Sequence, residues 1–133
     1  MIIEEYILRV AAETIKNGGS ASKLNDEKFL PPLDLWSFPK YPARTMVLPA
    51  TVDLAFELRR FITQNEDLLN EEDCWLGTWI NPRSGEYYLD IATGIADLSK
   101  ACNVAKKLSI EDGRKIVAIF NAKRNETIYL WDE

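Results

Sequence analysis

Residues 75–92, WLGTWINPRSGEYYLDIA, constrain the fold of this chain more than any other segment, because two strand-like runs flank a strong turn signal. The turn opens with Asn81, a common turn initiator, and Pro82, whose ring fixes φ at about −65°. Gly85 follows and can adopt a positive φ where the second run begins. The segment therefore predicts a β-hairpin, which fixes the register of a sheet rich in aromatic side chains.

Side chains alternate between the two faces of a strand, so the hairpin separates into two sets. The aliphatic set is Leu76, Ile80, Leu89 and Ile91. We expect this set to pack on a helix over residues 98–108. The opposite face then gathers aromatic side chains around one carboxylate, and the alternation of the last strand adds two more. The candidate binding residues are Trp75, Trp79, Tyr88, Asp90, Tyr129 and Trp131.

Two interpretations of this aromatic face stay open. In the structural one, the N-terminal helices and an aromatic segment fold onto the face, because aromatic side chains bury a large area. In the functional one, the face stays partly open and binds a partner, since tryptophan and tyrosine often anchor interfaces. Asp90 distinguishes the two: it is either paired, for example with Arg83 or a basic residue of the final hairpin, or exposed at a polar edge.

The N-terminal half predicts two helices separated by a proline-rich segment. Residues 2–17 repeat apolar side chains at helical spacing, and Gly18 predicts a left-handed C-terminal cap. Residues 20–50 hold five of the six prolines between aromatic side chains, which predicts an ordered strap lying across the domain. A proline-rich ligand for a partner's aromatic groove is the alternative. A core helix then begins at a Thr51 cap and extends to about Asn70.

The C-terminal half predicts the order ββαββ. After the first hairpin, Asp97 can cap the helix over residues 98–108, and a turn at residues 111–113 follows it. Residues 115–120 and 126–131 then predict a second hairpin.

Helices and hairpins are thus segregated along the chain, which is typical of the α+β class rather than of alternating βαβ units. We expect a single domain over residues 1–133. Two N-terminal helices and the strap, in residues 1–73, pack on a mainly antiparallel ββαββ sheet formed by residues 74–133.

The chain has no histidine and two cysteines, Cys74 and Cys102, which excludes several kinds of site. Without histidine there is no usual zinc, non-haem iron or imidazole-base chemistry, and two separated thiols do not make a four-ligand site. Both cysteines lie in apolar patterns and predict buried, reduced thiols. Glu71, Glu72 and Asp73 are consecutive, so we expect their carboxylates not to converge on one ion. We expect no metal and no cofactor.

The formal net charge is −5, and residues 1–73 hold the whole imbalance, with 13 acidic and 8 basic side chains. Residues 74–133 carry eight of each. An acidic chain argues against nucleic-acid binding, although Lys106-Lys107, Arg114-Lys115 and Lys123-Arg124 could form a local basic patch. No apolar run approaches the roughly 20 residues that span a bilayer, and the start is acidic where a signal peptide would be basic. We expect a cytoplasmic protein without membrane contact.

An enzyme built from this chain would use a carboxylate as its base. Asp90 is the best placed, with Tyr87, Tyr88 or Lys115 as the acid. The sequence contains no glycine-rich phosphate loop, nucleophile elbow or Walker lysine. It therefore favours a non-enzymatic module that binds a protein partner or self-associates through the aromatic face. A small enzyme or ligand-binding protein with Asp90 as acid or base is the alternative.

The hairpin resembles a module of small uncharacterised bacterial proteins, some of them from mobile elements. The resemblance rests on Leu76-Gly77-Thr78-Trp79-Ile80-Asn81-Pro82, then Ser84-Gly85-Glu86, then Tyr88-Leu89-Asp90-Ile91. In those proteins a short helix and a final strand pair follow the hairpin. The resemblance covers less than half of the chain and implies a bacterial accessory or partner-binding protein, without an activity or a catalytic residue.

Overall fold

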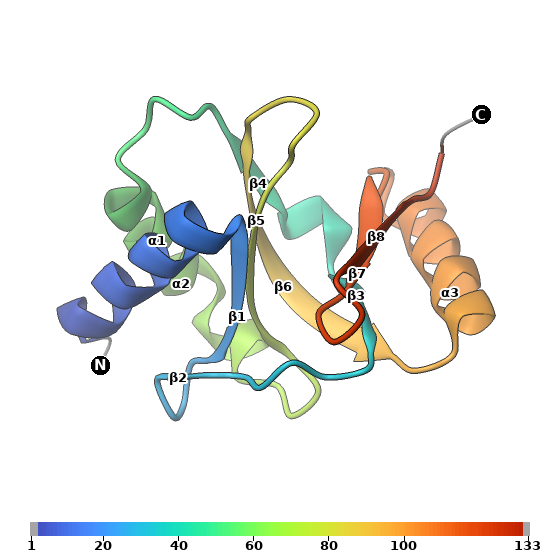
Figure 1. The fold of residues 1–133 in the computed structure, drawn as a ribbon, viewed down its shortest axis with the longest axis horizontal. Helices are drawn as coiled ribbons and strands as arrows, with labels where there is room; N and C mark the ends of the chain where they lie inside the picture. Colours follow the sequence, from blue (N-terminus) through green and yellow to red (C-terminus); the bar gives the residue numbers. More distant parts are fainter. Residues whose placement is uncertain (1–2, 132–133) are drawn as a thin grey trace.

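Three α-helices and a curled antiparallel sheet make up residues 3–131, the part of the chain that the computed structural model describes (Figure 1). The predicted α+β class is confirmed. The helices are α1 (Glu4–Asn17), α2 (Leu54–Leu69) and α3 (Leu98–Glu111), and a 3₁₀ turn, η1, covers Pro42–Arg44. The strands are β1 (Gly19–Lys23), β2 (Lys28–Phe29), β3 (Trp36–Pro39), β4 (Met46–Leu48), β5 (Trp75–Ile80), β6 (Tyr87–Ile95), β7 (Ala118–Asn121) and β8 (Glu126–Tyr129).

The predicted first hairpin is confirmed as β5 and β6, which pair along the whole of β5. Its loop closes because the Asn81 carbonyl oxygen accepts a hydrogen bond from the Gly85 amide at 2.7 Å. The Asn81 side chain accepts a second bond, from the Arg83 amide at 2.9 Å. Gly85 has a φ of +77°, as its place in the turn requires.

Residues 20–50 contribute strands to the sheet, so the prediction of a strap lying across the domain is wrong. β1 pairs with β5, and β3 and β4 both pair with the second edge of β6. In β3, buried Trp36 and Phe38 alternate with half-buried Ser37. That strand pattern is too short to stand out among prolines. Pro39 stands at the end of β3, where a missing N–H is tolerated.

The strand order is β2-β1-β5-β6-β3-β7-β8, with β4 also paired to β6. Along the chain, β5, β6, α3, β7 and β8 follow the predicted ββαββ order, and the second hairpin is present with shorter strands than expected. In space, β3 separates β6 from β7, so these four strands do not form a sheet of their own. The boundary expected after residue 73 therefore does not divide the sheet.

One face of the sheet packs against all three helices, in two separate cores. Leu76, Leu89 and Ile91 pack with α1 and α2 in the first core. Ile95, on the same face of β6, packs in the second core with Trp36 and α3. The aliphatic set of the hairpin was expected on α3, and that prediction is wrong. β6 is 9 residues long and the sheet curls along it, so the helices cover its two ends separately (Figure 1).

Most helix ends follow their predicted signals, but α3 extends to Glu111 instead of ending at residue 108. Gly18, at φ +82°, donates its amide to the carbonyl one turn back and ends α1. Asp97 begins α3 by accepting a hydrogen bond from the amide three residues on, at 2.8 Å. The cap of α2 is Asp53 rather than Thr51. Within residues 3–131, no helix has both the length and the hydropathy to cross a membrane.

Candidate functional site

The face of the sheet opposite the helices is concave and encloses an open cavity of about 520 Å³, which we call the groove. The strand register places its lining on one face, because Gly77 pairs with Asp90 of β6 and with Ala21 of β1. The sheet residues of this face that line the groove are Gly19, Ala21, Ser37, Pro39, Trp75, Gly77, Trp79, Asp90, Ala92, Ala118, Phe120 and Thr127. Leu30, Pro31, Pro32, Leu33 and Leu35 add a wall at one end.

The groove is hollow because small side chains form its floor between aromatic walls. Gly77, Ala92 and Ala118 line it beside Trp75 and Trp79. A methyl group at Gly77 would lie 3.0 Å from Cβ of Ala92, a tight contact that would require the neighbour to shift slightly. Glycine and alanine therefore pack closely in the floor, and a larger side chain at Gly77 would crowd Ala92.

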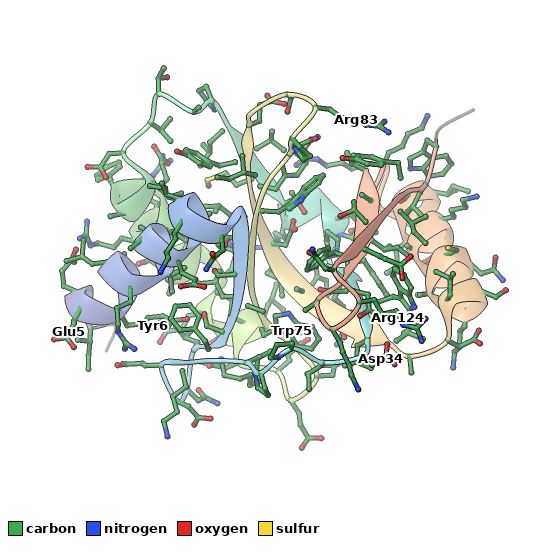
Figure 2. The ribbon with its side chains drawn as sticks, viewed as in Figure 1. Glu5, Tyr6, Asp34, Trp75, Arg83 and Arg124 are labelled. Carbon is green, nitrogen blue, oxygen red and sulfur yellow. The ribbon has the colours of Figure 1, made fainter. Side chains whose placement is uncertain are left out.

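The end wall of the groove is attached to the β7–β8 turn. Asp34 accepts hydrogen bonds from Arg124 Nε at 3.0 Å and from the buried Asn121 amide at 2.8 Å. Figure 2 shows Asp34 and Arg124 side by side below the β7–β8 turn. Because the Arg124 guanidinium and Asn121 bind the carboxylate, the pKa of Asp34 lies below its usual value. These contacts join residues of the N-terminal segment to the last hairpin.

Trp79, which lines the groove, also belongs to a cluster of aromatic rings on this face. The Trp79 ring lies 5.2 Å from the Tyr88 ring in an edge-on arrangement and 6.3 Å from the Tyr129 ring. The Arg83 guanidinium lies 3.5 Å from the centre of the Tyr129 ring, a cation–π contact. Figure 2 shows Arg83 near the tip of the β5–β6 hairpin. All three rings are half-buried.

Five of the six candidate residues share this concave face, and Trp131 does not. The Trp131 indole donates a hydrogen bond to the Ile116 carbonyl at 2.7 Å and packs against the second core. Lys115 lies 4.9 Å from its ring centre. β8 ends at Tyr129, so the alternation that placed Trp131 with the other aromatic residues no longer holds there.

Asp90 lies between the groove and a second, smaller cavity of about 210 Å³, and it lines both. Within the described chain, its side chain accepts one hydrogen bond, from Thr45 Oγ1 at 2.8 Å. Arg114 lines the smaller cavity and donates to the Thr45 carbonyl at 2.5 Å. Burial raises the pKa of the Asp90 carboxyl to about 6, against the opposing effects of the Thr45 hydrogen bond and the Arg114 charge. The carboxylate thus hydrogen-bonds to Thr45 and not to Arg83, a partner suggested from the sequence.

The residues considered as catalytic acids are not arranged as partners of Asp90. Tyr87 packs against the first core, on the opposite face of the sheet. Tyr88 and Lys115 line the smaller cavity with Asp90. Within residues 3–131, neither of them hydrogen-bonds to its carboxylate. The site therefore contains one carboxyl group with a raised pKa, Asp90, and no acid is hydrogen-bonded to it within the described residues.

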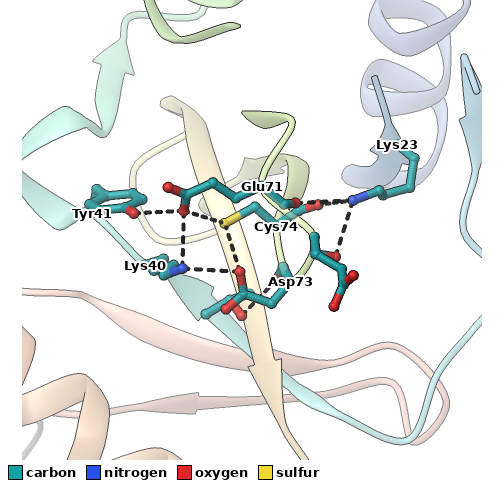
Figure 3. Close-up of polar contacts among 8 residues, drawn as sticks. Lys23, Lys40, Tyr41, Glu71, Asp73 and Cys74 are labelled. Carbon is teal, nitrogen blue, oxygen red and sulfur yellow. Dashed lines mark hydrogen bonds and ion pairs between the residues drawn. The ribbon is translucent and has the colours of Figure 1, made fainter. Parts of the chain in front are cut away.

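A second polar cluster connects the end of β3 to the loop between α2 and β5 (Figure 3). The Lys40 ammonium lies 3.0 Å from carboxylate oxygens of both Glu71 and Asp73. Tyr41 donates to Glu71 at 2.6 Å. The expectation that these carboxylates do not converge is therefore wrong for Glu71 and Asp73, which converge on an ammonium group. Hydrogen bonds from Tyr41 and Lys40 lower the pKa of Glu71, and the Lys40 bond lowers that of Asp73.

Cys74 adjoins this cluster, and its Sγ completes a possible metal-ligating group with Glu71 and Asp73, whose ligand atoms lie within 4.8 Å of one another. Burial raises the pKa of the Cys74 thiol to about 12, so a metal would have to displace both its proton and the Lys40 ammonium. The prediction of buried thiols is confirmed for Cys74 and wrong for Cys102, which is half-buried; both are free.

No protein-family model, curated protein or solved structure matches this chain.

Proposed function

We propose that this chain is a non-enzymatic binding module that holds a segment of a protein partner in the groove. The observation that carries the proposal is a set of half-buried aromatic side chains, Trp75, Trp79, Tyr88 and Tyr129, on a concave face that the helices leave open. Large, rigid aromatic side chains anchor interfaces at low entropic cost. A groove of about 520 Å³ is large enough to take several side chains of a partner.

The attachment of the end wall supports a groove that exists before binding. Asp34, Asn121 and Arg124 hold residues 30–35 against the β7–β8 turn. A preformed site loses less conformational entropy when it binds. A role as a bacterial accessory protein in the cytoplasm, as the hairpin resemblance implies, is compatible with two free thiols.

Ligand binding or acid–base catalysis at Asp90 is the second candidate function. The raised pKa of this carboxyl, about 6, favours it, because groups with perturbed pKa values in cavities often carry chemistry.

Self-association is a third candidate function, since Leu8, Ile15 and Phe56 are exposed on α1 and α2. Sedimentation of the purified protein measures self-association directly.

A peptide-display selection tests the proposal. The selected peptides are titrated against wild type, Ala21→Trp and Ala12→Trp. Ala21 lines the groove, so its replacement by tryptophan fills the space, whereas Ala12 is exposed on α1 and serves as the control. We expect the affinity to fall at least tenfold in Ala21→Trp and to stay within twofold in Ala12→Trp. Equal binding by both variants, or failure to select any peptide, would contradict the proposal.

A further inference from the structure

We infer that the groove recognises a basic side chain, lysine or arginine, presented by the partner segment, with its cation against Asp90. This inference rests on the proposed function and adds the chemistry of the occupant. Three features of the groove support it: the position of Asp90, the sign of the charges around it, and the cost of covering its carboxylate without a further hydrogen-bond donor.

The register places Asp90 in a slot between two tryptophans. Asp90 pairs with Gly77, and Trp75 and Trp79 lie two residues to either side of Gly77 on the same face. The Trp75 ring reaches toward Gly94, where an added Cβ would lie 3.1 Å from its edge. The Trp79 ring contacts Tyr88 instead. The two indoles therefore diverge, and glycine leaves open the space opposite the carboxylate.

The charges of the groove favour a cation. Among residues 3–131, the charged side chains that line it are Glu13 and Asp90, both carboxylates. Arg114 and Lys115 line the smaller cavity. Arg114 donates to the Thr45 carbonyl, so its hydrogen bond goes to the backbone and not to the Asp90 carboxylate.

An apolar occupant would cover Asp90 without supplying a hydrogen-bond donor. Thr45 supplies one hydrogen bond to this carboxylate, and covering the rest of it without a further donor is unfavourable, whereas a lysine or arginine cation compensates the charge. Tryptophan faces also attract cations, and the long aliphatic stem of either side chain can pack on the apolar walls. A basic side chain thus satisfies the carboxylate and the aromatic walls together.

Titrations with three capped tripeptides, acetyl-Gly-Lys-Gly-amide, acetyl-Gly-Arg-Gly-amide and acetyl-Gly-norleucine-Gly-amide, test the inference. The readout is the indole N–H signals in ¹⁵N–¹H spectra. Trp75 and Trp79 line the groove and should shift, whereas Trp36 and Trp131 lie in the second core and report nonspecific effects. We expect saturable shifts with the lysine and arginine peptides and at least tenfold weaker binding of the norleucine peptide.

Asp90→Asn provides the matched variant, because its amide oxygen can still accept the Thr45 hydrogen bond. Asp90→Asn should abolish the preference for the charged peptides. The control is Asp97→Asn at the exposed N-cap of α3, where asparagine can still cap the helix, and this variant should keep the preference. Equal binding of norleucine and lysine peptides would overturn the basic-side-chain inference and leave the groove proposal standing. Absence of any shift would overturn the inference and count against the groove as well. Butylamine binding as tightly as the lysine peptide would show that the site takes free amines, which also overturns recognition of a partner's side chain.

Discussion

Asp90 occupies a position that is costly for a charged residue. It is half-buried between the two cavities and accepts one hydrogen bond within the described chain, from Thr45. Burial raises the pKa of its carboxyl to about 6, so near neutral pH the fold holds a carboxylate in surroundings that favour the protonated form. Residues that reduce stability in this way are typical of binding and catalytic sites.

The raised pKa of Asp90 predicts a specific pH dependence of stability. Because the folded-state pKa lies above the ordinary value of 3.8, the stabilisation from proton binding is complete below about pH 4 and is lost as the pH rises through about 6. We expect the free energy of unfolding of Asp90→Asn, relative to wild type, to rise by about 1–3 kcal/mol between pH 4 and pH 7.5. Urea unfolding at both pH values measures it, and a constant difference would contradict the raised pKa.

Gly85 lies in the β5–β6 turn with a backbone conformation that favours glycine. Its φ of +77° is unfavourable for a β-branched side chain, although an added Cβ would meet no atom within 4 Å. We expect Gly85→Val to lower the free energy of unfolding by about 1 kcal/mol or more. Gly85→Asn is the control, because asparagine tolerates this conformation, and it should lose clearly less. Equal losses in the two variants would mean that backbone strain is not the cause.

The helices and the two hairpins could be predicted because their signals are local. Gly18, Asp97 and the Asn81–Gly85 turn each act within a few residues. Strands β1 to β4 could not, since they are short and are defined by pairing with distant segments. β3, for example, pairs with β6 on one side and β7 on the other. The curl of the sheet, which decides which helix covers the aliphatic set, depends on those same distant pairings.

The candidate site could be predicted in part. Alternation along the hairpin correctly placed Trp75, Trp79, Tyr88 and Asp90 on one face. The groove itself was missed, because its depth comes from small side chains on several strands and from the wall of residues 30–35. The one local signal for it is Gly77 between two tryptophans, a position where a strand has no side chain to fill its face.

At the level of elements, Lys40 connects the end of β3 to the loop between α2 and β5. Lys40→Met would leave the Glu71 and Asp73 carboxylates facing each other, so we expect a lower urea midpoint at pH 7. Both carboxyls have pKa values lowered by Lys40, so this stabilisation is present above their ordinary values and is lost as the pH falls through the lowered ones. The difference from wild type should therefore shrink below about pH 4.

Lys100→Met is the control for this variant, because Lys100 is an exposed lysine on α3. It removes the same charge and should leave the midpoint nearly unchanged. If the urea midpoint falls equally in both variants, or if its fall in Lys40→Met is independent of pH, the polar cluster does not act as an ionic connection between these segments.

In the whole molecule, the two helical layers pack at the two ends of one curled sheet, and the groove lies on the opposite face (Figure 1). Leu76, Leu89 and Ile91, which face the helices, are fully buried, whereas the aromatic side chains of the opposite face are half-buried. Adjacent positions of the same strand thus have different roles. One set stabilises the fold, and the other is the set to which we assign partner binding.

Trp79→Ala and Leu89→Ala test this division of roles within the first hairpin. Leu89 is fully buried in the first core, so its truncation should cost about 2–5 kcal/mol of unfolding free energy. Trp79 is half-buried, and its truncation should cost less than that of Leu89. Because Trp79 lines both cavities beside Asp90, its loss should weaken binding of the display-selected peptides by about 2 kcal/mol, roughly thirtyfold.

The two measurements separate an interface residue from a core residue, because each variant should affect mainly one of them. Leu89→Ala, studied at a temperature where it stays folded, should bind the peptides with nearly wild-type affinity. The opposite pattern, in which Trp79→Ala destabilises as strongly as Leu89→Ala while peptide affinity is unchanged, would make the aromatic face part of the core. In that case the tryptophans hold the curled sheet together, and the partner-binding surface must lie elsewhere on the molecule.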